Sequence, residues 1–346
     1  MSQRARARNG DLGTGGDEAL GARLPPAHIA RMSDHAHSTG PGEGHPALVF
    51  DRRVLRQRRE RAARAGRLED FMLARIAEEL SDRLATINRD FPIAACLGAG
   101  DHSLARALMA TGKIASMVHG DRSETVARHG PGPALVHDDE VLPFADASLD
   151  ALLSIQSLHW VNDLPGALAQ MRRALRADGL FLGAMLGEDT LTELRQAMLT
   201  AESEVAGGVS PRVSPFVELR ETGSLLQRAG FALPVVDTDR LTVRYSDPLT
   251  LMRELQAMAA TNALAARSRK LLPRAVLMRA MEIYQELFSD PDGRIRATFQ
   301  IVYLIGWAPH ESQQKPLRPG SAAARLADAL NATEHTVPGT RGRGSG

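Results

Sequence analysis

Residues 91–100 read FPIAACLGAG, a short apolar run that ends in Gly98, Ala99 and Gly100. An apolar run of this length before a glycine turn predicts a buried parallel strand, and the residues after it predict a helix over about 102–109. Glycine has no Cβ, so the backbone at such a turn can approach a nucleotide-like ligand closely. A plain strand-to-helix turn has the same pattern, so the segments that follow must decide between the two interpretations.

Downstream segments repeat the alternation of apolar runs and polar turns. The apolar run 114–119 predicts a second strand that leads to Asp121. This acid stands about twenty residues after the glycine turn, where nucleotide-binding α/β folds place an acid that accepts hydrogen bonds from ribose. An acidic turn follows with HDDEVLPF at 137–144, and DALLSIQ at 150–156 predicts a buried strand that leads into SLHW at 157–160.

The rest of the chain continues in the same way. The predicted elements are helices over 163–175 and 188–205, strands over 180–185, 232–239 and 297–307, and two helices within 247–290. This order predicts an α/β fold with a doubly wound, mostly parallel sheet of seven strands and a helical insertion before the last strand. Ligands of such sheets bind at the carboxyl ends of the strands. One pocket is therefore expected to contain Gly98, Gly100, Asp121, Asp138 and His159.

Composition divides the chain into four parts. Residues 1–47 and 309–346 are rich in polar residues, glycine and proline without a hydrophobic period, and we expect 1–47 and most of 309–346 to be disordered. Between them, residues 48–90 predict basic helices and 91–308 the α/β domain. Eight arginines fall within 51–67. They either belong to a solvated helix that pairs with nearby acids, or form a docking surface for an acidic partner or for membrane headgroups.

Whole-chain composition excludes several classes of protein. Lys plus Arg number 42 and Asp plus Glu number 41, so the net charge of +1 does not indicate a nucleic-acid partner. Cys96 is the single cysteine, which excludes an intrachain disulfide and suits a reducing compartment. No apolar run approaches the roughly 18–20 residues that span a bilayer, so we expect a soluble protein. His102 has no further ligands at a convincing spacing, so no metal site is predicted.

The ordered series of glycine turn, acid, acidic turn and strand with a His-Trp ending resembles the class I S-adenosylmethionine (SAM) methyltransferases. A closer resemblance, to the methyltransferase-like assembly proteins of respiratory complex I, covers nearly all of 49–320. The stretches that carry it are VFDRRVLRQRRERAAR, SLHWVNDLPGAL, GAMLGEDTLTELR, GGVSPRVSPF, ATFQIVYLIGW and HESQQKP.

That resemblance implies a role in the assembly of the NADH:ubiquinone oxidoreductase, with a protein substrate among its subunits. It also implies modification of an arginine in the quinone-module iron–sulfur subunit, described for the family as hydroxylation. Members are mitochondrial in eukaryotes, which implies the matrix side there. For the alphaproteobacterial relatives it implies the cytoplasm or the inner face of the inner membrane, where the arginine-rich helix would give a peripheral association.

Carried over by position, the resemblance implies SAM as the cofactor. Gly98 and Gly100 would face its methionine part, Asp121 its ribose and Asp138 its adenine amino group. The remaining expected cofactor-binding residues are Asp139 and Gln156.

The family's Asp-x-Gly-x-Gly-x-Gly motif is incomplete in this chain. Cys96 stands where the acid is expected, and His102 stands where the third glycine is expected. Loss of the acid removes a charge-assisted hydrogen bond to the cofactor, on the order of 1.5–3 kcal/mol. Weak or absent SAM binding is therefore an open alternative.

His159 and Trp160 have two interpretations. His159 can be a base near the transferred group, since its ordinary pKa lies close to neutral. Alternatively, Trp160 packs under the pocket and His159 orders the loop. We predict a SAM-dependent methyltransferase that acts on a protein. Two alternatives remain: an arginine hydroxylase of a complex I subunit, and a non-catalytic assembly chaperone with a degenerate SAM pocket.

Overall fold

The computed structural model describes residues 48–314 except for 67, 69–70, 101–102 and 129–131. The predicted disordered segment 1–47 and most of the predicted tail lie outside the described residues, as does His102. None of the helices within the described part has the length and apolar character needed to cross a membrane.

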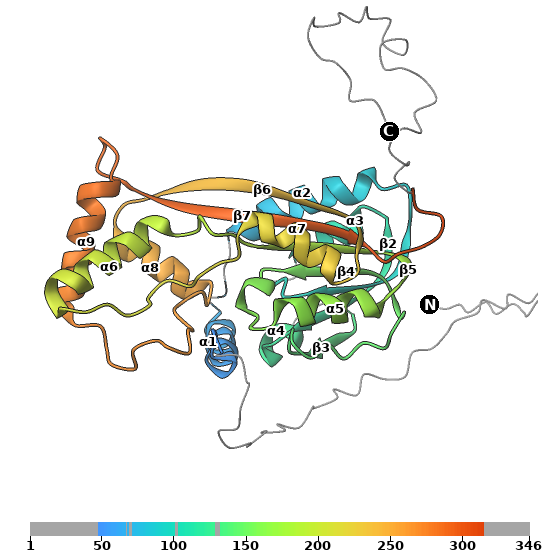
Figure 1. Cartoon of the computed structure of the whole chain (residues 1–346), viewed down its shortest axis with the longest axis horizontal. Coiled ribbons are helices and arrows are strands. Elements are labelled where there is room, and N and C mark those ends of the chain that lie inside the picture. The colour runs from blue at the N-terminus through green and yellow to red at the C-terminus, as the bar shows by residue number, and fades with distance from the viewer. Residues whose placement is uncertain (1–47, 67, 69–70, 101–102, 129–131, 315–346) are drawn as a thin grey trace, which may run out of the picture.

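A seven-stranded sheet forms the centre of the molecule, in the order β3-β2-β1-β4-β5-β7-β6 (Figure 1). Strands β1 to β5 pair in parallel, and β7 is antiparallel to both β5 and β6. The bounds are β1 Phe91–Leu97, β2 Ile114–Asp121, β3 Ala134–Val136, β4 Leu149–Ile155, β5 Leu175–Leu186, β6 Ala232–Tyr245 and β7 Ile295–Trp307. The predicted doubly wound, mostly parallel sheet is confirmed, and its strand order reverses between β1 and β4.

Alternate residues of β1 face two layers of helices. Ala94 and Cys96 pack with α2 and α3, whereas Ala95 and Leu97 pack with α5 and α7. Burial on both faces explains why this strand is a continuous apolar run. The helices are α1 Arg52–Arg64, α2 Met72–Thr86, α3 Ser103–Ala110, α4 Glu124–Arg128, α5 Leu164–Ala174, α6 Thr192–Ala206, α7 Leu219–Arg228, α8 Pro248–Ala257 and α9 Arg274–Phe288.

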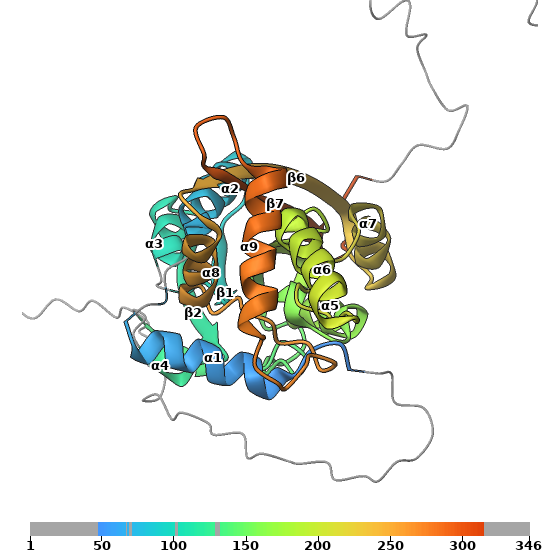
Figure 2. The same ribbon diagram turned by 90° about the vertical axis from the view of Figure 1, so that its left-hand side faces the viewer.

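The strand predicted over 232–239 is longer in the structure. β6 continues to Tyr245 because it pairs with β7 along its length, from Ala232 opposite Trp307 to Tyr245 opposite Ile295. Its second half, DRLTVRY, has a weak hydrophobic pattern because β6 lies at the edge of the sheet and is partly exposed. α8 and α9 follow between β6 and β7 and lie beside α6 at one end of the molecule (Figure 2).

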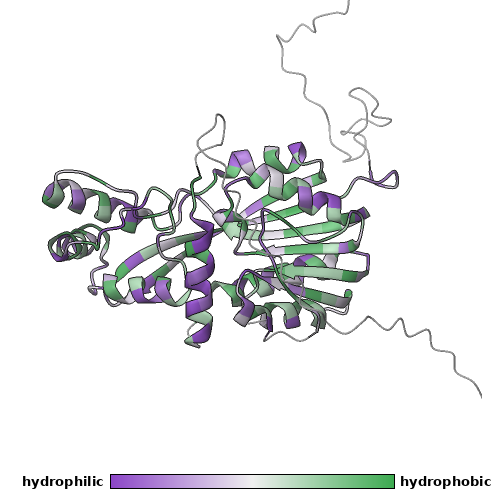
Figure 3. Ribbon diagram, turned by 90° about the horizontal axis from the view of Figure 1, so that it is seen from below, coloured by the Kyte–Doolittle hydropathy of each residue, from purple (hydrophilic) through white to green (hydrophobic). Residues whose placement is uncertain are grey.

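Helix α1 lies outside both helix layers. It runs beside α4, at the end of the sheet where the parallel strands finish (Figure 2). Its side chains are predominantly hydrophilic, in contrast to the strands (Figure 3). Only Leu55 and Ala62 of this helix are buried. With so little apolar surface, α1 depends on polar contacts for its position.

Candidate functional site

The carboxyl ends of β1, β2 and β4 surround a small polar cavity, here called the edge cavity. Its volume is about 40 Å³. It is lined by Leu55, Arg59, Gly98, Asp121, Arg122, His137, Asp139, Gln156, Ser157, His159, Trp160, Leu186, Met258, Ala259 and Ala260. The cavity therefore lies where the strand order reverses, which is the usual ligand position of a doubly wound sheet.

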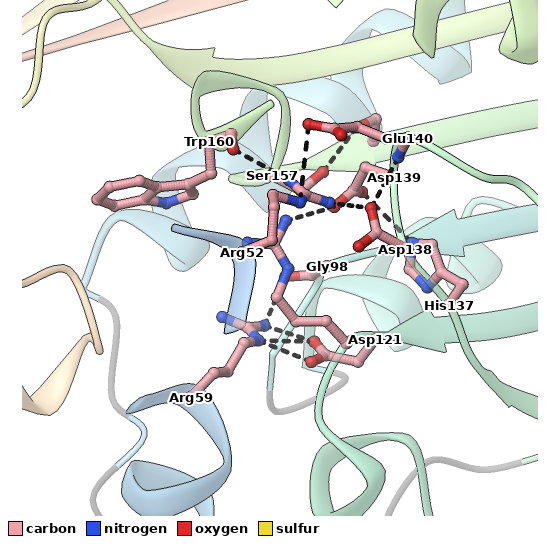
Figure 4. Close-up of polar contacts among 12 residues, drawn as sticks. Arg52, Arg59, Gly98, Asp121, His137, Asp138, Asp139, Glu140, Ser157 and Trp160 are labelled. Atoms are coloured by element: carbon pink, nitrogen blue, oxygen red, sulfur yellow. Dashed lines mark hydrogen bonds and ion pairs between the residues drawn. The ribbon is translucent and has the colours of Figure 1, made fainter. Parts of the chain in front are cut away.

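Asp121 ends β2 and directs its carboxylate at Arg59 of α1 (Figure 4). The Asp121 side chain is 2% exposed. Arg59 Nε donates to Oδ1 and Oδ2 at 2.7 and 2.9 Å, and its Nη2 donates to Oδ2 at 2.5 Å. The same Nη2 donates to the Gly98 carbonyl oxygen at 3.0 Å. The carboxylate predicted to bind ribose is thus held by an arginine of the chain itself.

The two acids of the predicted acidic turn lie differently. Asp139 is 1% exposed and forms an ion pair with Arg122, and His137 Nε2 lies 3.3 Å from its Oδ1. Burial would raise the pKa of Asp139, but the Arg122 guanidinium and His137 hold that pKa well below its usual range. Asp138 is 48% exposed, pairs with Arg52 of α1, and is not among the residues that line the edge cavity.

Glu60 fixes α1 against the start of α4. Its carboxylate accepts hydrogen bonds from Ser123 Oγ at 2.6 Å, Thr125 Oγ1 at 2.5 Å and Thr125 N at 3.2 Å. Burial would raise the pKa of Glu60, but these donors lower it to about 2, so the group is charged at neutral pH. Because Glu60 follows Arg59 directly, this contact holds Arg59 over Asp121.

Most of the predicted cofactor-binding residues come together. Gly98, Asp121, Asp139 and Gln156 all line the edge cavity. Gly100 is not among the lining residues, and a Cβ on it would lie 3.1 Å from the Leu73 side chain of α2. The roles of all these residues, and that of Asp138, stay predictions.

Sequence reasoning did not place Arg59 in the site, because the arginines of α1 were expected either to pair with nearby acids on a solvated helix or to form a docking surface. A usable signal was present. Arg52 and Arg59 are seven residues apart and share a helical face with the apolar Leu55 and Ala62, so they turn inward with those two residues.

His159 lies in the short 3-10 turn Leu158–Trp160 that follows β4. Its side chain is buried, and the Leu186 backbone N–H donates to Nδ1 at 3.3 Å. Burial, and then the nearby charge of Arg122, lower the pKa of His159 to about 3. The imidazole is therefore neutral at physiological pH and a weak base. This geometry favours a role in ordering the loop over a role as general base.

The low pKa of His159 predicts an acid-dependent loss of stability. Below its ordinary pKa of 6.5, the imidazole binds a proton in the unfolded chain but not in the folded one, so stability falls as pH drops from about 6.5 toward 3. Each unit of pKa difference corresponds to about 1.4 kcal/mol. We expect His159→Gln to remove this part of the pH dependence, which urea unfolding at a series of pH values would measure. An identical slope in the variant and the parent chain would contradict it.

The structure also bears on the single cysteine and on metal binding. Cys96 is buried in β1, and burial raises the pKa of its thiol to about 12, so it stays protonated and acts as a core residue. Within the described part of the chain, no three His, Cys, Asp or Glu side chains are grouped so that they could hold a metal ion.

The residue types around the edge cavity fit SAM, but the cavity as it stands is too small to hold it. A buried carboxylate, a backbone carbonyl and a glutamine meet at the end of the sheet, as a nucleoside requires. Small-molecule pockets usually measure about 300–1,000 Å³, far above the 40 Å³ found here. The Arg59 guanidinium binds the Asp121 carboxylate and lines the cavity, so its displacement would both free Asp121 and enlarge the cavity.

Comparison with known proteins identifies the type of domain to which the central part of the chain is similar. A family model described as a methyltransferase domain matches residues 95–183, which contain Gly98, Asp121, Asp139 and His159. This match agrees with the predicted SAM-type domain. Among solved structures, the YcgJ protein of Bacillus subtilis covers 68% of this chain and 99% of its own, with a TM-score of 0.48 and 14% identity.

Similarity to curated proteins extends over most of the chain. The human mitochondrial arginine-hydroxylase NDUFAF5 is 36% identical over 329 residues, which is 92% of this chain and 95% of the human protein. The Danio rerio protein of the same name is 38% identical over 81% of this chain and 89% of its own. A malonyl-[acyl-carrier protein] O-methyltransferase of Laribacter hongkongensis is 40% identical, over 54% of this chain and 61% of its own.

Proposed function

Because this chain belongs to the family of the arginine-hydroxylase NDUFAF5, we propose that it binds SAM at the edge cavity and modifies an arginine side chain of a protein substrate. The observation that carries the proposal is the meeting of Gly98, Asp121, Asp139 and Gln156 at the carboxyl ends of parallel strands. The resemblance to complex I assembly proteins supports a subunit of the NADH:ubiquinone oxidoreductase as the partner.

Each group around the cavity has a definite part in this proposal. Asp121, which already accepts three hydrogen bonds from Arg59, would accept the ribose hydroxyls instead. Asp139 stays charged and carries its own partners, so it orders Arg122 and His137 around the cavity. Trp160 and Leu186 form the wall toward the arm of α6, α8 and α9, since they line both this cavity and the one beside α6 and α8.

Methyl transfer is the first candidate reaction, supported by the methyltransferase domain model. When bound, SAM supplies an electrophilic methyl group. A guanidine nitrogen of the substrate would form the new N–C bond as the S–C bond breaks, and the displaced N–H proton would leave to solvent. His159, with its pKa near 3, would not take that proton at neutral pH.

Arginine hydroxylation, which needs an oxygen-donating oxidant in addition to SAM, is the second candidate, supported by the relatives that are named arginine-hydroxylases. The two reactions leave different masses on the substrate. Complex I subunits would be purified from cells with and without this gene, and their arginine peptides compared by mass spectrometry. A gain of one CH₂ supports methyl transfer and a gain of one oxygen supports hydroxylation. Unmodified peptides in both samples would overturn the proposal and leave the assembly-chaperone alternative.

SAM binding is tested separately by calorimetric titration of the purified chain with SAM and with S-adenosylhomocysteine. We expect binding that Asp121→Asn weakens at least about tenfold, because the loss of a charge-assisted hydrogen bond is worth about 1.5–3 kcal/mol. Asp146→Asn is the matched control, since the side chain of Asp146 is 74% exposed and does not line the cavity. Equal binding by Asp121→Asn and the parent chain would contradict the assigned role of Asp121.

A further inference from the structure

A second and much larger cavity lies between α6, the loop after it, and α8. Its volume is about 650 Å³, within the usual range of ligand pockets of about 300–1,000 Å³. We call it the apolar cavity because its walls are mainly aliphatic and aromatic, including Leu194, Met198, Phe216, Met252 and Leu255. A cavity of this size and lining favours a ligand with a substantial apolar body.

The apolar cavity adjoins the edge cavity. Trp160, Leu186, Met258 and Ala260 line both of them. A ligand in the apolar cavity would therefore reach the end of the sheet where Gly98 and Asp121 lie. The arm of α6, α8 and α9 (Figure 1) provides walls that the sheet alone could not.

The charged residues that line the apolar cavity are all positive. Two arginines and no carboxylate are found among its described lining residues. Arg212 is neutralised by Glu202, which accepts from its Nε at 2.8 Å and its Nη2 at 2.5 Å. Arg58 donates to the Asn262 carbonyl oxygen, and no ion pair to it is found within the described residues.

The surroundings of Arg58 disfavour a cation. Burial, and then the neighbouring charges of Arg267 and Arg61, lower the pKa of its guanidinium. Of these neighbours, Arg267 already has a carboxylate partner, Asp51, at 3.1 Å. An anionic group beside Arg58 would gain a charge-assisted hydrogen bond, whereas a second guanidinium would be repelled.

We propose that the apolar cavity binds a medium- or long-chain carboxylate, with the chain among the apolar side chains and the carboxylate against Arg58. This ligand differs from the protein arginine of the proposed function. The cationic group of such an arginine would be repelled by Arg58, for which no ion pair is found within the described residues.

The test uses the full chain without SAM and a dansyl-labelled undecanoic acid, whose emission rises in apolar surroundings. Dodecanoate, dodecanol and dodecyltrimethylammonium then compete with the probe below their micelle concentrations. We expect dodecanoate to displace the probe about tenfold better than dodecanol, the effect of one charge-assisted hydrogen bond, and the cation to displace it least.

Three variants locate the site. Arg58→Gln should abolish the preference for dodecanoate over dodecanol while the probe still binds. Arg56→Gln, on the exposed side of the same helix, should keep that preference. Met252→Trp should weaken binding of the probe, because the larger side chain narrows the cavity.

Four outcomes would overturn the proposal: no probe binding, displacement by the alkyl cation as good as by dodecanoate, an unchanged preference in Arg58→Gln, or undiminished binding to Met252→Trp. A segment of the chain outside the described residues that fills the cavity would give the first of these. Because SAM is absent from the assay, failure here leaves the proposed function standing, and failure of SAM binding leaves this proposal standing.

Discussion

Gly98→Ala is expected to lower the free energy of unfolding by about 4 kcal/mol or more, a loss that few single substitutions reach. Gly98 has a φ of +81°, and a Cβ on it would lie 2.3 Å from the Ile155 carbonyl oxygen and 3.2 Å from Ser157 Cβ. That oxygen belongs to the backbone of β4, so relief requires the strand to move. Urea unfolding of the purified variant measures the loss.

Gly66→Ala is the matched control for this substitution. Gly66 also has a positive φ, of +61°, but nothing lies within 4 Å of the added Cβ. Its cost should be only the backbone penalty of about 1–2 kcal/mol. Equal losses in the two variants would mean that φ alone requires glycine at 98, and that the close approach to β4 contributes nothing.

Arg59→Met is expected to destabilise the ligand-free protein by about 3 kcal/mol, because it leaves the buried Asp121 carboxylate without its charged partner. Three hydrogen bonds from Arg59 to Asp121 and one to the Gly98 carbonyl oxygen disappear, while Ser123 N still donates to Asp121 Oδ1 at 2.8 Å. Arg59→Met combined with Asp121→Asn should lose much less, since the amide carries no charge. Thermal unfolding of the parent chain, the two single variants and the double variant gives the coupling free energy between Arg59 and Asp121. If the two single losses of stability simply added in the double variant, the ion pair would not be stabilising.

The same substitution is expected to raise SAM affinity about tenfold, equivalent to about 1.4 kcal/mol. In the proposed binding mode, Arg59 and the ribose compete for the Asp121 carboxylate, so a protein without Arg59 would not have to break the ion pair before it binds SAM. Arg56→Met is the control, since Arg56 lies on the exposed side of α1. Weaker binding by Arg59→Met than by the parent chain would instead make Arg59 a direct contact of the cofactor.

The sequence predicted the sheet well because its strands are short apolar runs at regular intervals. Most residues of β1 and β4 are buried, on both faces of the sheet, so both strands appear in the sequence as continuous apolar runs. The prediction was less accurate at β6, which ends at Tyr245 rather than at 239. An edge strand that is half exposed gains its length from pairing with β7, and a local pattern does not contain that partner.

The site was predicted in part for the same reason. Asp121, Asp139 and His159 follow strands, and the carboxyl ends of parallel strands meet at one edge. Gly98 also reached the expected cavity, although a Cβ there would meet β4 rather than open space. What the sequence did not indicate is the proton state of His159, because burial and Arg122, from a different segment, set its pKa.

By itself, the sequence determined the order of strands and helices and the edge of the sheet at which the site lies, because both depend on local hydrophobic patterns and chain direction. Only the tertiary structure decided which side chains from other parts of the chain contact the site at that edge. Arg59 is 62 residues from Asp121 along the chain, and Arg58 reaches Asn262 across 204 residues. Contacts over such separations form because α1 packs both against the ends of the strands and against the segment that follows α8. A local sequence pattern does not contain the position of α1 relative to these distant segments.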